Sequence, residues 1–159
     1  MVGTNKMQYW EDLSIGQVFK TGTITIDAEE IIAYATQFDP QPYHLDPAIA
    51  KQSIFGGHCA SGWQVCALMM RLLADTIKDQ SIASVGSSGV ESLRWLKPVF
   101  ADDTLHATIE IVNHRSIESE HGYGLIACAI DVKNQHSKSV IVLNTDIMID
   151  KRNPVSSTD

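Results

Sequence analysis

The chain has 159 residues, of which 44% are hydrophobic and 19% are charged, a balance typical of one globular domain. This length supports one hydrophobic core and is too short for two. The net charge is −7, and no run of Lys or Arg interrupts the acidic background. We therefore expect no nucleic-acid partner, because polynucleotide binding needs a basic stripe.

The cysteines and the apolar segments predict a cytoplasmic protein. Cys59, Cys66 and Cys128 are scattered without C-x-x-C spacing, as in reduced intracellular proteins. The N-terminal segment lacks the apolar stretch of a signal peptide. The longest apolar stretch is interrupted by Arg71 and is too short to cross a membrane, so we expect no membrane segment.

The first third of the chain predicts a strand and two helices around a proline-rich segment. Residues 17–26 are strand-like, with an interruption at Gly22. Asp27 and Glu30 predict a capped helix over 28–37. The next ten residues, FDPQPYHLDP, contain three prolines, which exclude the interior of a regular helix or strand. Asp46-Pro47 then predicts the start of a short helix.

Residues 62–78 predict a long helix with almost no polar face. Such a helix has to be buried on most of its sides. At 1.5 Å per residue it would be about 25 Å long, close to the width of a domain.

The remainder of the chain predicts strands over 89–97, 104–111, 123–133 and 139–149. One buried helix and about five antiparallel strands can pack only if the sheet curls around the helix. We therefore predict an α+β hot-dog fold over 8–151, followed by a flexible tail over 152–159. Because such a single layer leaves the helix and an edge strand uncovered, we also expect a homodimer or a higher homo-oligomer.

Asp39 and His44 are candidates for proton transfer. They lie five positions apart on the proline-rich segment, where Pro40 and Pro42 restrict the backbone. A carboxylate and an imidazole on a rigid loop are suited to hold and deprotonate one water molecule. The alternative is that Asp39 caps a turn and His44 is a surface histidine, and the spacing alone favours this alternative.

The segment FGGHCASGW, residues 55–63, predicts a backbone site for an anion. Ser61 and Gln64 fit a capping box, which makes Gly62 the first helical residue and leaves its N–H free. A glycine there permits close approach of a ligand, and the helix dipole adds partial positive charge. This geometry suits a thioester oxygen that becomes enolate-like. A plain loop-to-helix junction is an equally good interpretation.

The other polar residues are better explained without a function. Cys59 is interpreted as a buried thiol, because no base is identifiable beside it. Arg94 and Lys97, close to Pro98, could contact a nucleotide phosphate, although solvated strand charges are commoner. The remaining histidines have no metal-like spacing, so no metal site is predicted; they are His58, His106, His114, His121 and His136.

The run DPQPYHLDP, residues 39–47, resembles the hydratase motif of MaoC-like dehydratases and (R)-specific enoyl-CoA hydratases. Gly62 stands 18 residues after His44, as the oxyanion glycine of that family does. LKPVFADDTL, residues 96–105, is similar to the family's K-x-P-V-x-x-G-D segment, and YWEDLSIGQVF resembles its opening.

The resemblance implies a hot-dog homodimer that adds water to a trans-2-enoyl thioester, or removes it. Asp39 and His44 would activate the water and deliver the α-proton, and the Gly62 amide would polarise the thioester carbonyl. No metal or redox cofactor is implied, and the substrate would be an acyl-CoA or acyl-carrier-protein thioester.

The chain departs from the family's usual residues at Gln41, Tyr43 and Ser61, which affects the expected substrate more than the reaction. The positions expected to contact the substrate are Gln41, Tyr43, Phe55, Gly57, Ser61, Trp63, Arg94 and Lys97.

Three other functions remain as alternatives. A hot-dog thioesterase would place a carboxylate on or beside the central helix, but residues 62–74 contain no Asp or Glu. An iron oxygenase could use His44-x-Asp46 as part of its ligand set, although Pro42 and Pro47 disfavour the necessary strand. A non-catalytic acyl-thioester binder is compatible with the same fold.

Overall fold

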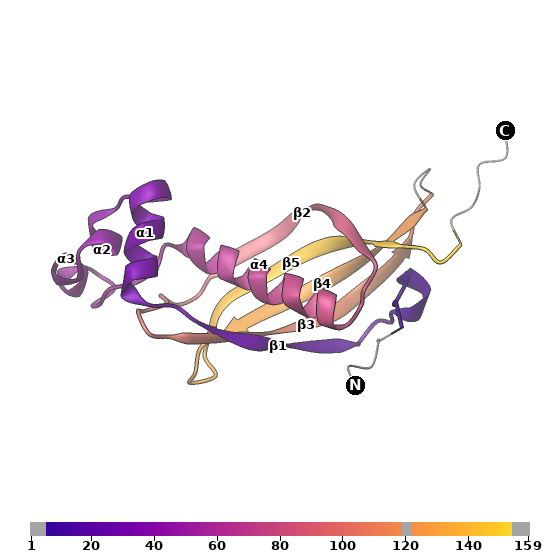
Figure 1. Cartoon of the computed structure of the whole chain (residues 1–159), viewed down its shortest axis with the longest axis horizontal. Helices are drawn as coiled ribbons and strands as arrows, with labels where there is room; N and C mark the ends of the chain where they lie inside the picture. The colour runs from indigo at the N-terminus through magenta and orange to yellow at the C-terminus, as the bar shows by residue number, and fades with distance from the viewer. Residues whose placement is uncertain (1–5, 119–121, 154–159) are drawn as a thin grey trace.

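The computed structural model describes residues 6–118 and 122–153 and has the predicted α+β hot-dog architecture (Figure 1). A 3₁₀ turn at Trp10–Asp12 precedes the first strand. The other elements are β1 (Val18–Thr25), α1 (Ala28–Phe38), α2 (Pro42–Leu45), α3 (Pro47–Gln52), α4 (Gly62–Asp79), β2 (Ser84–Trp95), β3 (Thr104–Ser116), β4 (Tyr123–Lys133) and β5 (Ser139–Asp150).

The five strands form one antiparallel sheet in the order β1-β3-β4-β5-β2. In β3, Leu105, Ala107, Ile109 and Ile111 are buried, as their alternation predicts. Strand β2 is different, because almost all of its residues are exposed and its register with β5 shifts at three points. It begins five residues before the predicted strand, since SVGSS has no alternating pattern to indicate a strand.

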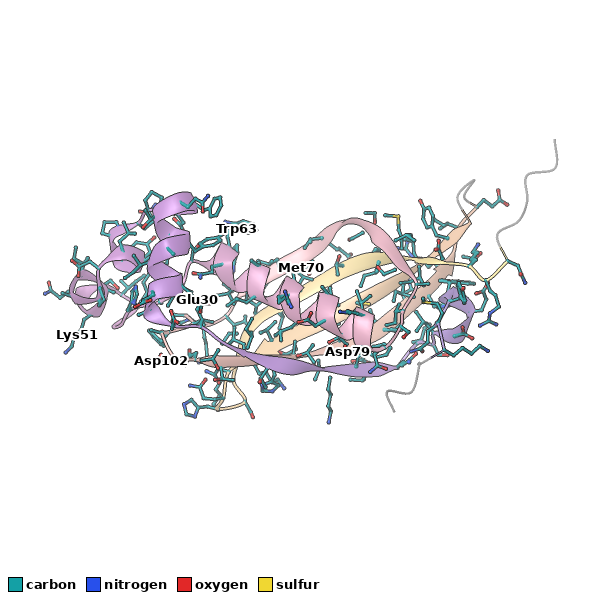
Figure 2. All side chains as sticks on the ribbon, in the orientation of Figure 1. Glu30, Lys51, Trp63, Met70, Asp79 and Asp102 are labelled. Atoms are coloured by element: carbon teal, nitrogen blue, oxygen red, sulfur yellow. The ribbon has the colours of Figure 1, made fainter. Side chains whose placement is uncertain are left out.

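Helix α4 packs one face against the concave side of the sheet. The residues buried on this face are Gln64, Val65, Met69, Leu72, Leu73 and Thr76. The expectation that α4 is buried on most sides is wrong for the single chain, because Trp63 is 61% and Met70 is 53% exposed. Figure 2 shows both residues along the upper side of the helix. The two residues are apolar, and in the single chain they remain uncovered.

The helices before α4 gather at the end where α4 begins (Figure 1). The predicted cap of α1 is confirmed, since Asp27 accepts from Glu30 N at 2.8 Å and Glu30 accepts from Asp27 N at 3.1 Å. Asp46 caps α3 as predicted. The one-turn helix α2 was not expected in a proline-rich segment. It forms because Pro42 stands at its first position, where no backbone N–H is required.

At the opposite end of the sheet, the first turn of the chain contacts strands β3 and β4. The Trp10 indole stacks on His114 with ring centroids 3.9 Å apart, and its N–H donates to Leu125 O at 3.2 Å. None of the helices in the described ranges is long and apolar enough to span a membrane. Residues 154–159 of the predicted tail lie outside the described residues.

Candidate active site

Asp39 lies at the C-terminal end of α1 and is directed inward by helical spacing. Ile31, Ala35 and Asp39 follow one another at intervals of four, and the first two are buried. The Asp39 side chain is 27% exposed. A carboxylate here faces the negative end of the helix dipole, which costs stability. Local costs of this kind are typical of functional positions.

His44 lies in α2 and is held by the backbone of the loop before α4. Its Nδ1 lies 2.7 Å from Cys59 O. A carbonyl oxygen only accepts, so Nδ1 carries the proton and Nε2 of the neutral ring is an acceptor. Nε2 lies 3.4 Å from Asp39 Oδ2, and the His44 side chain is only 7% exposed. The hydrogen bond therefore fixes the tautomer in which the basic nitrogen faces Asp39.

The loop that accepts this hydrogen bond is fixed on its other side by residues 99–101. Ala60 N donates to Val99 O at 2.8 Å, and Ala101 N donates to His58 O at 3.1 Å. Cys59 forms an isolated β-bridge with Phe100. The backbone around Cys59 thus lies between His44 and a second chain segment, which positions the imidazole.

The N-terminus of α4 begins at Gly62, as predicted, but the predicted capping box is wrong. Ser61 makes no side-chain cap hydrogen bond, and the Gln64 side chain donates to Glu30 O in α1 at 3.1 Å instead. The hydrogen bond from Gln64 to Glu30 O thus takes the place of the predicted capping interaction with Ser61. The Ser61 hydroxyl is fully buried and has no partner among the described residues. The Gly62 N–H likewise has no hydrogen-bond partner in the described chain.

Asp39, His44 and Gly62 line one cavity of about 440 Å³. Four other predicted contact residues, Tyr43, Phe55, Ser61 and Trp63, line it as well, and so does Lys97. The rings of Tyr43 and His44 meet edge-on at 4.6 Å, and those of Tyr43 and Phe55 lie 5.2 Å apart. Burial of one face of the imidazole by Tyr43 limits its movement.

Three of the predicted contact residues lie outside the lining of this cavity. Gln41 is exposed, and its carbonyl accepts from the His44 and Leu45 amides. Gly57 packs against the Phe100 ring, where an added Cβ would lie 3.1 Å from the ring. Arg94 lines a separate concavity formed by strands β2 to β5. Neighbouring residues of a strand point to opposite faces, so Arg94 points away from the face occupied by Trp95.

The sequence analysis missed several residues that complete the cavity wall. Trp95, Leu96 and Pro98 come from the end of β2 and the segment after it, and Ile141 comes from β5. Within 94–97 the charges of Arg94 and Lys97 gave no indication of Trp95, which strand alternation places on the face opposite to Arg94. Ile141 stands directly opposite Trp95 in the β2–β5 register, which could not be known from the sequence.

The cysteines near the cavity are protonated at neutral pH. Burial raises the pKa of the Cys59 thiol, whose sulfur lies 3.9 Å from His44 Nδ1. Burial also raises the pKa of Cys66. The interpretation of Cys59 as a buried thiol is therefore confirmed, with an exposed fraction of 1%.

The ligand set expected of an iron oxygenase is not assembled around His44. The Asp46 carboxylate accepts from Ala48 N at 2.7 Å and Ile49 N at 3.3 Å, as a helix cap. Within residues 6–118 and 122–153, no three His, Cys, Asp or Glu side chains are grouped to hold a metal ion. His121 lies outside the described residues.

Comparison with known proteins matches residues 12–127 to the MaoC like domain. The uncharacterized protein YdeM of Bacillus subtilis (strain 168) is 28% identical over 141 residues, covering 87% of this chain and 96% of YdeM. The MaoC-like dehydratase from Rhodospirillum rubrum has a TM-score of 0.83 and 32% identity, covering 92% of this chain and 99% of that one. The R-hydratase PhaJ1 from Pseudomonas aeruginosa shares the fold, with a TM-score of 0.67 and 24% identity over 91% of this chain and 86% of its own.

Proposed function

Because the chain belongs to the MaoC-like domain family, we propose that it adds water to a trans-2-enoyl thioester, or removes it, using Asp39, His44 and the Gly62 amide. One observation supports this assignment above all. The imidazole and the carboxylate lie 3.4 Å apart and face the same cavity as the free amide of the α4 N-terminus. An enzyme that hydrates an enoyl thioester needs a base, an acid and an oxyanion donor around one slot.

The hydrogen bonds of His44 indicate how the pair would hold a water molecule. Nδ1 donates to Cys59 O, so in a neutral imidazole Nε2 is left as an acceptor beside the carboxylate oxygen of Asp39. At 3.4 Å the two atoms leave no room for a water between them, but a water in the cavity beside both would donate one proton to each. Its oxygen lone pairs would remain available for attack.

The proposed hydration has two steps, addition of the water oxygen to Cβ and protonation of Cα. The water oxygen bonds to Cβ of the enoyl group while one of its protons passes to His44 Nε2 or to Asp39. The π electrons move to the thioester oxygen, where the Gly62 N–H and the helix dipole stabilise the enolate. The proton then returns to Cα, which regenerates the pair. Dehydration follows the same steps in reverse.

The other cavity residues would hold the substrate. Tyr43, Phe55 and Trp63 provide apolar surface for the acyl group. The buried, unpartnered Ser61 hydroxyl can donate to a bound oxygen. Lys97 is exposed at the cavity and would contact a phosphate of coenzyme A or of a carrier-protein arm.

A thioesterase is a weaker alternative on this geometry. Among the described residues that line the cavity, Asp39 supplies the carboxylate, and it comes from α1 rather than from the central helix. Asp75 of α4 forms an exposed pair with Arg71 at 2.8 Å and does not line the cavity. A non-catalytic binder would use the same cavity without needing the Asp39–His44 geometry.

The test is a panel of trans-2-enoyl-CoA substrates of different chain lengths, assayed with the wild type, Asp39→Asn and His44→Ala. We expect turnover to fall by about 10²-fold or more in each variant, the usual scale for a general acid–base group. Enoyl absorbance and free thiol are followed together. Thiol release without earlier loss of the enoyl signal would support the thioesterase instead.

Asp46→Asn is the matched control for Asp39→Asn. Asp46 lies on the same segment but caps α3, and Asn caps helices as well as Asp does. Its turnover should equal that of the wild type. If the wild type binds CoA esters but hydrates none of them, the protein is a binder. Near-normal turnover of Asp39→Asn or His44→Ala would contradict their assigned roles.

The exposed apolar residues support assembly into a homodimer. Trp63 and Met70 of α4 and Val85 and Val90 of β2 are each more than half exposed. An edge strand and an amphipathic helix of this kind are usually covered by a second chain. Sedimentation equilibrium tests the proposal, and Met70→Glu should shift the protein towards the monomer.

A further inference from the structure

Trp95, the last residue of β2, places its indole directly against Gly62. A Cβ built on Gly62 would lie 2.6 Å from Nε1 and 2.7 Å from Cε2 of the indole. Approach below 3.0 Å to a ring held by its own neighbours requires one of the two groups to move. Gly62 has helical rather than positive-φ geometry, so its backbone conformation does not require glycine. The Trp95 ring requires glycine here, because it occupies the place of a Cβ.

Trp95 is 46% exposed, and its indole is held on the side that faces α4. The indole N–H lowers the pKa of the Cys66 thiol against the larger raising effect of burial, which places the ring beside this residue, one turn after Gly62. The Trp63 ring meets it edge-on, with centroids 5.1 Å apart and an interplanar angle of 82°. Its backbone stands opposite Ile141 of β5, which is buried and lines the cavity. Trp95 therefore connects the sheet to the first turn of α4.

The helix tip has no side-chain cap. Ser61 makes no cap hydrogen bond, and Gln64 ties the first turn of α4 to α1 by donating to Glu30 O at 3.1 Å. The backbone is fixed by the sheet-like contacts only as far as Ala60, through Val99. Beyond that point, the Trp95 ring contacts the first helical residue from the side of the cavity wall.

From this geometry we propose that Trp95 is the positioning residue of the oxyanion amide, fixing the direction of the Gly62 N–H. The inference rests on the proposed hydratase function. A hydrogen bond to a developing oxyanion depends strongly on direction. The proposal also explains why residue 62 is glycine: the indole leaves no room for a Cβ, whether or not the substrate contacts this residue.

A double-mutant cycle tests the proposal with Gly62→Ala, Trp95→Leu and the pair together. The added methyl group of Gly62→Ala collides with the indole and displaces the tip, so kcat should fall by about 10²-fold. Trp95→Leu removes the ring that packs against Gly62 and should lower kcat by about 10-fold, with KM changed much less. In the double variant the collision is absent, so kcat should equal that of Trp95→Leu alone.

Two further measurements separate positioning from simple loss of stability. Trp95→Phe keeps an aromatic face over the helix tip and should recover much of the kcat lost in Trp95→Leu. Each variant is assayed well below its own unfolding midpoint, determined by circular dichroism, so that all molecules counted are folded.

Two results would overturn the proposal while leaving the hydratase function intact. The first is an unchanged loss from Gly62→Ala in the Trp95→Leu background, which would mean that the substrate itself requires the glycine. The second is wild-type kcat in Trp95→Leu. A wild type that hydrates no enoyl thioester would instead refute the proposed function, and with it this inference.

Discussion

His58 and His44 each hydrogen-bond through the imidazole to the backbone of the other's segment. His58 Nε2 donates to His44 O at 2.6 Å, and His44 Nδ1 donates to the carbonyl of Cys59 at 2.7 Å. The two contacts join α2 to the loop before α4. As a result, two hydrogen bonds hold His44 to the loop that leads into α4, although the two come from different segments.

Replacing His58 should weaken this network. His58→Leu removes the donor to the His44 carbonyl and should lower the free energy of unfolding by about 1 kcal/mol, the usual worth of a hydrogen bond. Since α2 would then be less fixed, turnover should fall as well. Chemical denaturation and kcat measure the two effects.

His58→Gln serves as the control, because its amide can still donate to the His44 carbonyl. It should retain more turnover and more stability than His58→Leu. Equal losses in both variants would show that the ring is needed for packing, not for its hydrogen bond.

Lys97 and Arg94 should differ in their effects on substrate binding, since only Lys97 lines the cavity. For a CoA substrate, Lys97→Ala should raise KM by about five-fold, the scale of ~1 kcal/mol for one exposed ion pair. The increase should disappear at high salt, which screens exposed charges. Arg94→Ala should leave KM unchanged, and an equal increase in both variants would contradict the placement of Arg94.

Gly124 lies far from the cavity, and Gly124→Ala should lower the free energy of unfolding. A Cβ at Gly124 would lie 2.5 Å from the Trp10 Nε1, and the indole is held there by its hydrogen bond to Leu125 O. Overpacking of this kind costs about 1–3 kcal/mol. Gly22→Ala is the control, because nothing lies within 4 Å of its added Cβ. Urea unfolding measures both, and equal midpoints would show that Trp10 moves aside freely.

Cys128 should make the protein sensitive to alkaline pH. Burial raises the pKa of the Cys128 thiol from 9.0 to about 12, with a further increase from the charge of Asp146. Between these values the unfolded chain loses the thiol proton and the folded chain keeps it. The stability from this group is therefore complete below pH 9 and is lost as the pH rises to about 12.

The measurement is the free energy of unfolding as a function of pH, for the wild type and Cys128→Ala. The wild type should lose more stability across this alkaline window than the variant. Parallel curves would mean that the thiol does not contribute to the pH dependence.

Local patterns predicted most of the fold. The alternation over residues 105–111 predicted which side of β3 faces the core, and the apolar composition of 62–78 predicted the helix but not its exposed side. The start of β2 could not be predicted in this way, because Ser84–Ser88 pairs with β5 while exposing almost every side chain. Its pairing depends on the position of a distant strand.

The candidate site was less predictable than the fold. The spacing of Asp39 and His44 alone favoured a non-functional interpretation, and the resemblance to the MaoC-like motif identified them with Gly62; the three residues line one cavity. The capping box at Ser61 and Gln64 failed because Gln64 reaches α1, a contact between segments 34 residues apart. Trp95 was missed since its role depends on the packing of a strand end on a helix tip.

Trp95, Leu96, Lys97 and Pro98 are consecutive in the chain, and all four line the cavity, whereas Asp39 and His44 belong to a different segment. Substitutions at Leu96 or Pro98 would reshape the space around a ligand without touching Asp39 or His44. Under the proposed function, single changes in this short stretch of sequence would therefore alter which molecules are accepted while the proposed catalytic residues stay in place.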